Sequence, residues 1–104
     1  MDSSGNRILV TGVPGQFGGV GSAIIEMLRR RDLPVRAFVR HEDQRTDALR
    51  ASGVEVVVGD LTQVRDIANA LSGCRRMYFG MSVSPRYLEV TANIAAVARE
   101  HTGL

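Results

Sequence analysis

The strongest constraint on how this chain of 104 residues folds is an apolar strand pattern that runs directly into spaced glycines. Residues 8–10 are apolar, and Gly12, Gly15 and Gly18 follow at intervals of three. Without a Cβ, the first two glycines let the backbone approach a ligand, and the third lets a helix pack closely on the strand. The N–H groups and positive dipole end of that helix then face an anion. The segment predicts a pyrophosphate site, with a plain glycine-rich turn as the alternative.

The glycine run continues, which leaves the start of the helix open. Gly15, Gly18 and Gly21 fit the same template, and Ser22 is a favourable N-cap residue. We therefore expect a longer loop and a helix over about residues 22–31. Its expected core face consists of Ala23, Ile24, Met27 and Leu28.

The end of the second strand pattern, residues 35–39, carries the residue type that separates the two nicotinamide dinucleotides. It lies about 20 residues after the glycine loop, where a dinucleotide fold contacts the adenosine ribose. Arg40 stands there, and a guanidinium can bind a 2′-phosphate through two parallel hydrogen bonds. Arg40 therefore favours NADP. The alternative is a solvated arginine at a strand end, and Glu42 and Asp43 follow closely enough to weaken the argument.

The remainder of the chain alternates strand and helix patterns. We expect a helix over 43–52 that Gly53 ends, a strand over 54–58 buried on both faces, a helix over 63–71 capped by Thr62, a strand over 76–80 and a last helix that Pro85 opens. The expected buried side of the last helix is Leu88, Ala92, Ala95, Ala96 and Val97. Strands separated by helices imply parallel crossovers. The predicted fold class is α/β, a Rossmann-like doubly wound parallel sheet with the strand order 3-2-1-4.

Three segments carry a resemblance to a known family. They are Thr11-Gly12-Val13-Pro14-Gly15-Gln16-Phe17-Gly18, Val35-Arg36-Ala37-Phe38-Val39-Arg40 and Gly53-Val54-Glu55-Val56-Val57-Val58-Gly59-Asp60-Leu61. At their mutual spacing they resemble the N-terminal half of NmrA-like, atypical short-chain dehydrogenase/reductases, a Rossmann family. The resemblance covers nearly all of the chain from Arg7 onward. It implies that Pro14, Gln16 and Phe17 belong to the cofactor site with the three glycines.

The resemblance also assigns the end of the third strand to the adenine. In such families the aspartate at this step accepts a hydrogen bond from the adenine amino group, and that role falls here on Asp60, with Leu61 against the ring. The arginine after the second strand is associated there with NADP, which agrees with the charge of Arg40. The alternative for Asp60 is an ordinary turn residue before a helix.

Two departures from the family bear on domain organisation and catalysis. The chain ends at Leu104, where a fifth strand is expected, so we interpret residues 1–104 as a single NAD(P)-binding domain, the N-terminal half of a longer protein. All thirteen basic residues are arginines. The Tyr-x-x-x-Lys pair of ordinary short-chain dehydrogenases, in which lysine lowers the tyrosine pKa, is therefore missing from this chain. We assign no catalytic residue and expect Tyr78 and Tyr87 to be core or rim residues.

The loop after the fourth strand is a weaker candidate. Ligands in open α/β sheets bind where the strand order reverses, which is between the first and fourth strands. Ser82 and the neighbouring Ser84 are therefore candidates to contact the nicotinamide half of a dinucleotide. Both are equally expected as turn residues ahead of a helix.

Composition disfavours several classes of partner. The net charge is only +2 despite a pI near 9.3, too little to argue for nucleic acid. The two histidines, His41 and His101, are isolated and lack metal-ligand spacing. The absence of an 18-residue apolar run and of a signal-peptide pattern argues against a membrane, and the single Cys74 suits a reducing cytosol, so we expect a cytoplasmic protein. An open edge at the fourth strand favours a homo-oligomer.

Two function classes remain, with NADP as the expected cofactor and NAD as the second possibility. The first is hydride transfer between the nicotinamide and a small carbonyl or quinone-like acceptor. The second is a non-catalytic redox sensor, because NmrA-like proteins include members that bind a dinucleotide without turning it over. A truncated product that binds nothing is a third interpretation.

Overall fold

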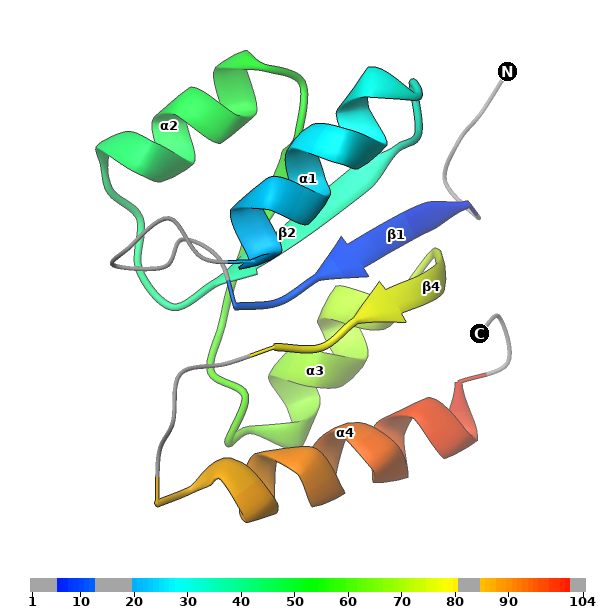
Figure 1. Ribbon diagram of the computed structural model, residues 1–104. Helices are drawn as coiled ribbons and strands as arrows, with labels where there is room; N and C mark the ends of the chain where they lie inside the picture. The colour runs from blue at the N-terminus through cyan, green and yellow to red at the C-terminus, as the bar shows by residue number, and fades with distance from the viewer. Residues whose placement is uncertain (1–5, 13–19, 81–84, 102–104) are drawn as a thin grey trace.

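The computed structural model describes residues 6–12, 20–80 and 85–101, in which strands and helices alternate (Figure 1). The elements are β1 (Arg7–Val10), α1 (Val20–Arg30), β2 (Val35–Val39), α2 (Gln44–Ala51), β3 (Glu55–Val58), α3 (Val64–Leu71), β4 (Cys74–Tyr78) and α4 (Tyr87–Glu100). The predicted alternation is confirmed.

The four strands form one parallel sheet in the order β3-β2-β1-β4. The helices α1 and α2 cover one face, and α3 and α4 cover the other (Figure 1). The chain moves outward from β1 to β3 and then returns to β4, and because crossovers are right-handed the later helices lie on the opposite face. The predicted Rossmann-like fold class and strand order are confirmed. The order reverses between β1 and β4.

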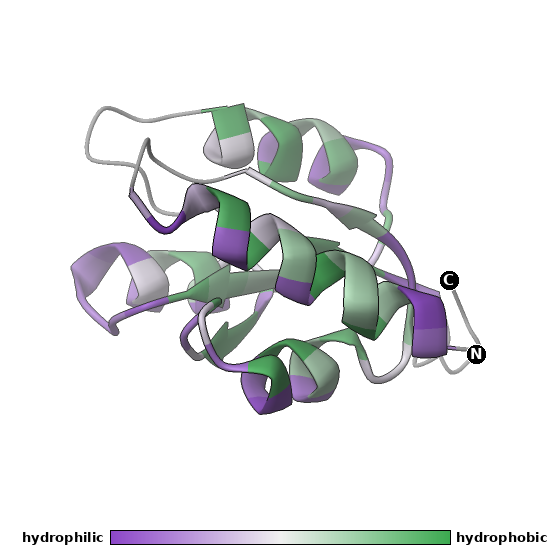
Figure 2. Ribbon diagram, turned by 90° about the horizontal axis from the view of Figure 1, so that it is seen from below, coloured by the Kyte–Doolittle hydropathy of each residue, from purple (hydrophilic) through white to green (hydrophobic). Residues whose placement is uncertain are grey.

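Each face of the sheet has its own core, because successive strand residues point to opposite sides. Ile8 and Val10 of β1 pack with Ile25 of α1. Leu9, between them, packs on the other face with Ile67 of α3. Figure 2 shows hydrophobic and hydrophilic residues alternating along the helices, which is typical of helices with one side on a core and the other in solvent.

The buried face of α1 differs from the prediction. Ala23 and Met27, expected in the core, are exposed. Ile24 and Leu28 are half-buried, and Ile25 is the fully buried side chain. Gly21, one turn before Ile25, is also buried, so the buried face of α1 runs through these two residues.

The buried face of α4 was also predicted wrongly. Its buried residues are Val90 and Ile94, one turn apart. Of the five predicted core residues only Val97 is half-buried, and the exposed ones are Leu88, Ala92, Ala95 and Ala96. Alanines recur around this helix, so their spacing did not distinguish one face from another. The larger Val90 and Ile94 bury more apolar area and decide its orientation.

The predicted helix over residues 43–52 is confirmed to within one residue at each end. Asp43 is its N-cap, and the Asp43 carboxylate accepts hydrogen bonds from the backbone amides of Arg45 and Thr46. The Thr46 hydroxyl accepts one from the Asp43 amide, which completes a capping box. Gly53 follows the helix with a φ of 97°, as predicted for a glycine that ends a helix.

The two outer strands differ from their predictions. Strand β3 was expected to be buried on both faces, but its residues are half-buried and Val58 is 46% exposed, because β3 is an edge strand. Strand β4 begins at Cys74, which pairs with Arg7, rather than at residue 76, and it ends two residues earlier than expected. Within the described part of the chain β4 is the other edge. Self-association along this edge stays a prediction.

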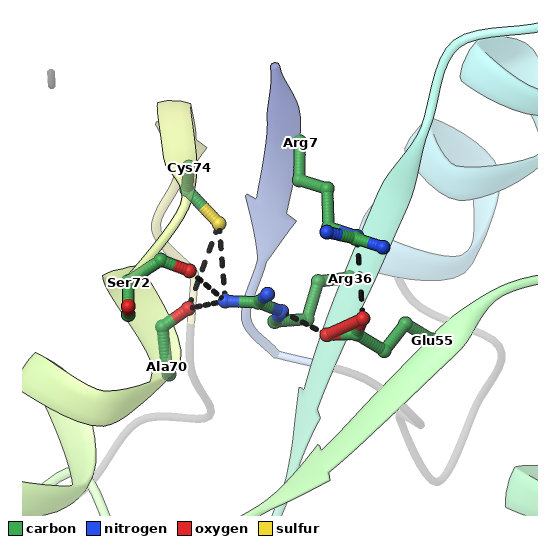
Figure 3. Close-up of polar contacts among 6 residues, drawn as sticks. All are labelled: Arg7, Arg36, Glu55, Ala70, Ser72 and Cys74. Carbon is green, nitrogen blue, oxygen red and sulfur yellow. Dashed lines mark hydrogen bonds and ion pairs between the residues drawn. The ribbon is translucent and has the colours of Figure 1, made fainter. Parts of the chain in front are cut away.

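The most unusual interior side chain is that of Arg36 in β2, a strand buried along its whole length. Arg36 is 8% exposed. Its Nη1 donates hydrogen bonds of 2.5 Å to the backbone carbonyls of Ala70 and Ser72 and lies 3.5 Å from Sγ of Cys74 (Figure 3). The last turn of α3 is thereby tied to β2, because its free carbonyls find a charged donor.

A carboxylate on the neighbouring strand balances this buried charge. Glu55 of β3 is the register partner of Arg36, and its Oε1 accepts a hydrogen bond from Nε of Arg36. Its Oε2 lies 3.2 Å from Nε of Arg7 on β1 (Figure 3). The cluster therefore joins β1, β2, β3 and α3 at the end of the sheet where the strands begin.

We predict that Arg36→Met lowers the free energy of unfolding by about 3 kcal/mol, because the Ala70 and Ser72 carbonyls lose their buried donor. Urea denaturation measures this value. Arg76→Met removes an exposed arginine from β4 and is the matched control, expected to change stability by no more than about 0.5 kcal/mol. Equal losses for the two variants would contradict the assignment.

Candidate functional site

The carboxyl ends of all four strands meet at one edge of the sheet, because the strands are parallel. Thr11 and Gly12 follow β1, Arg40 follows β2, Asp60 lies just beyond β3, and Gly80 lies just beyond β4. Ligands of open α/β sheets bind at this edge, where the strand order reverses. The structure therefore brings the described candidate residues to the place where a ligand is expected.

Thr11 joins β1 to β4 at the point of reversal. It is fully buried, and its backbone amide donates a 3.0 Å hydrogen bond to the Tyr78 carbonyl. Its hydroxyl donates to the Gly80 carbonyl at 2.9 Å and accepts from the Gly80 amide at 2.8 Å. One side chain thus satisfies both polar backbone groups of Gly80 and fixes the start of the loop after β4. The motif analysis did not assign this role to Thr11.

Gly12 occupies a position that only glycine fits. Its φ is 77°, in the left-handed region, and a Cβ there would lie 2.7 Å from the carbonyl oxygen of Gly80. Both the backbone conformation and the close approach of the two strand ends therefore require a residue without a side chain. This agrees with the predicted role of Gly12 in a tight turn.

Helix α1 begins at Val20, two residues before the predicted start at Ser22. Gly21 is buried inside its first turn, whereas Gly15 and Gly18 lie outside the described residues, so the choice between the two glycine templates stays a prediction. The first turn carries no acidic side chain that would compensate the positive end of the helix dipole. The remaining predicted cofactor residues lie outside the described ranges, namely Pro14, Gly15, Gln16, Phe17, Gly18 and Ser82.

The two acidic residues that follow Arg40 are engaged by arginines of α2. Glu42 forms an ion pair with Arg50. Asp43 lies 3.0 Å from Nη2 of Arg45, and this hydrogen bond lowers the pKa of the Asp43 carboxyl. Arg40 itself is exposed at the end of β2. The acidic residues that weakened the argument for Arg40 therefore have basic partners of their own.

Asp60 is held as an anion in a short turn. Its Oδ1 accepts hydrogen bonds of 2.8 Å from both the amide and the hydroxyl of Thr62. These bonds lower the pKa of the Asp60 carboxyl, and the nearby guanidinium groups of Arg40 and Arg86 lower it further. An ionised carboxylate only accepts hydrogen bonds, and its Oδ2 accepts none from the described residues. Asp60 can therefore receive a donor from a ligand.

The turn that contains Asp60 changes the start of α3. Thr62 was expected to cap this helix, but its hydroxyl donates to Asp60 instead, and the N-cap is Gln63, without a side-chain cap. Leu61, expected against an adenine ring, is half-buried and packs on the core below α3 and α4.

The two tyrosines lie near the end of β4. Tyr78 is half-buried and packs against the core under α1, whereas Tyr87 is 47% exposed at the start of α4. The Tyr87 ring is tilted against that of Phe79, with 5.9 Å between centroids. One tyrosine is thus a partial core residue and the other a surface residue.

Two further properties concern metals and membranes. Among the described residues, no three His, Cys, Asp or Glu side chains gather as a metal site would require. None of the described helices combines the length and the apolar character needed to cross a bilayer.

Comparison with known proteins agrees with this geometry. The family model described as NAD(P)H-binding matches residues 15–103. The chain belongs to this NAD(P)H-binding family. The match covers the glycine loop from Gly15 onward and all of the sheet beyond β1.

Individual relatives of this NAD(P)H-binding chain are reductases. It is 29% identical over 87 residues to an NAD(P)H azoreductase of Xenophilus azovorans, covering 84% of this chain and 30% of the relative. The Citrobacter sp. triphenylmethane reductase complexed with NADP(H) superposes with a TM-score of 0.72 at 29% identity, covering 90% of this chain and 33% of that one. The Escherichia coli NADPH-dependent quinone oxidoreductase QOR2, complexed with NADPH, has a TM-score of 0.72 at 26% identity, covering 88% and 32%.

The chain thus spans about a third of the length of these proteins. Their similarity agrees with the predicted family of NAD(P)-dependent reductases.

We predict that Gly12→Ala reduces stability more than Gly53→Ala does. Both glycines have a positive φ, but a Cβ at Gly53 would meet the flexible end of Arg29, at 2.9 Å, whereas one at Gly12 would meet backbone. The shared conformational cost is about 1–2 kcal/mol, and the Gly12 variant has in addition to push β1 and β4 apart. Thermal unfolding of both variants measures the difference. A smaller loss at Gly12 would show that the two strand ends separate easily.

Proposed function

We propose that this chain is the NADPH-binding part of a reductase. The observation that carries the proposal is the carboxyl edge of the sheet in a chain of the NAD(P)H-binding family, where Gly12 lies at the point of strand reversal and Arg40 and Asp60 follow the next two strands along the same edge. Each of these residues has the chemistry that one part of the dinucleotide requires.

The diphosphate is assigned to the β1–α1 corner. Gly12 makes the tight turn that follows β1, and α1 offers the positive end of its dipole from a first turn that carries no acidic side chain. Among residues outside the described ranges, we assign Gly15 and Gly18 to the same group, with Pro14, Gln16 and Phe17 beside them, and Ser82 to the nicotinamide half.

The adenosine half is assigned to the ends of β2 and β3. Asp60 keeps a carboxylate oxygen for the adenine amino group, and Leu61 lies beside it. Arg40 is exposed, and its guanidinium is close enough to Asp60 to lower the pKa of that carboxyl. The neighbouring carboxylates of Glu42 and Asp43 form ion pairs with Arg50 and Arg45. A guanidinium at this position favours a 2′-phosphate.

We predict that Arg40→Met weakens NADPH binding about ten- to a hundredfold and leaves NADH binding within about twofold, because only NADPH carries the 2′-phosphate. Isothermal titration with each dinucleotide measures both affinities. Arg99→Met, on the last turn of α4, removes the same charge from another part of the surface and is the control. Equal weakening of both dinucleotides by Arg40→Met would refute the NADP preference.

The proposed reaction is hydride transfer from NADPH to a small carbonyl or quinone-like acceptor. The bound nicotinamide supplies the hydride, and the role of the described residues is to hold and orient the dinucleotide. Three of the similar proteins are named as reductases of azo compounds, triphenylmethanes and quinones, which supports an acceptor of conjugated, electron-poor character. No Tyr-x-x-x-Lys pair exists in this chain, so protonation by such a tyrosine is not part of the proposal.

A redox sensor is the second candidate function, because dinucleotide binding without a tyrosine and lysine pair suits it equally well. We predict that the chain consumes NADPH when a quinone is added, followed as the loss of absorbance of the reduced nicotinamide. The Arg40→Met variant, which changes an exposed side chain and is expected to bind NADPH more weakly, serves as the control and should consume NADPH more slowly at low NADPH concentration. Tight NADPH binding without consumption would favour the sensor.

A further inference from the structure

The loop that carries Asp60 is held by side chains from two helices. Oδ2 of Asp66, in the first turn of α3, accepts a 2.9 Å hydrogen bond from the Asp60 amide. Nδ2 of Asn93, in α4, donates to the backbone carbonyls of Leu61 and Thr62, at 3.3 Å each. Backbone groups of three successive residues, 60–62, are thus hydrogen-bonded to helix side chains, in addition to the bonds between Asp60 and Thr62 within the turn.

Asn93 is well placed to act as a fixed donor. It stands between Val90 and Ile94 on the side of α4 that packs against α3, and both of these neighbours are buried. The position of α4 is therefore set by the core, and the Asn93 amide follows it. The carbonyls that it contacts are 31 and 32 residues away in sequence, so this link is tertiary and not part of a local turn.

The entry to the loop is equally confined. A Cβ on Gly59 would lie 2.9 Å from the ring of Phe38 and 3.1 Å from Cβ of Asp66. The backbone therefore passes between β2 and α3 with no space for a side chain. Asp66 then fixes the direction of the next amide, that of Asp60.

We propose that Asn93 and Asp66 are positioning residues that hold the Asp60 loop in the conformation that receives the adenine end of the dinucleotide. The inference rests on the proposed function for the identity of the ligand. A loop that is ordered before binding loses less conformational freedom when the ligand arrives, and this increases affinity. Neither residue touches the ligand itself in this proposal.

The binding experiment uses Asn93→Ala and, as its matched control, Asn69→Ala, which removes an exposed amide from α3. The probes are NADPH, adenosine 2′,5′-bisphosphate and reduced nicotinamide mononucleotide. Asn93→Ala should weaken the two adenine-containing probes by about three- to tenfold and leave the mononucleotide unchanged, whereas Asn69→Ala should change none. Equal affinities for Asn93→Ala and the unsubstituted chain would overturn the proposal.

Hydrogen exchange of the ligand-free chain separates this inference from the proposed function. Asn93→Ala should speed exchange of the Thr62 amide, and Asp66→Ala that of the Asp60 amide. Asp66→Asn retains an acceptor oxygen and should largely restore the slow exchange. Unchanged exchange in the alanine variants would refute the positioning role even if NADPH binds. Failure of the unsubstituted chain to bind NADPH would instead refute the proposed function, whatever the exchange rates show.

Discussion

The contact between Thr11 and Gly80 is the interaction on which the site depends. In a doubly wound sheet the two strands at the point of reversal, here β1 and β4, are neighbours in space but are not connected directly by one crossover. The Thr11 hydroxyl bridges this point by bonding to both backbone groups of Gly80. Gly12 then allows the two chain segments to lie in contact. The point of strand reversal is therefore held together by one hydroxyl group and by a residue that has no side chain.

The order and type of the elements could be predicted because they depend on local patterns. The β-branched run before Gly59 and a glycine that ends a helix, such as Gly53, each act within a few residues. The strand order followed from the alternation of strands and helices and from the handedness of their connections. Gly12 was recognisable for the same reason, because few residue types other than glycine can form a tight turn directly after a strand.

Features that depend on distant residues could not be predicted. The buried face of α4 was predicted wrongly because its alanines offered several apolar stripes, and that of α1 because adjacent apolar residues such as Ile24 and Ile25 fit more than one face; packing against the sheet selected among them. Thr62 looked like a cap, but the Asp60 carboxylate took its hydroxyl. Asp66 and Asn93 gave no local signal, because their partners are identified only when the chain has folded. A charged residue inside an otherwise apolar strand was the one available sign of the Arg36 cluster.

Helix α3 is fastened at both of its ends by polar bonds. Its closing carbonyl at Ala70 receives the Arg36 guanidinium, and its opening turn receives the Asp60 amide through Asp66. This helix of eight residues is about 12 Å long and runs from the edge of the sheet where the strands end to the edge where they begin. A substitution that loosens the Arg36 end of α3 is therefore expected to disturb the Asp60 loop as well, although the two lie at opposite edges of the sheet.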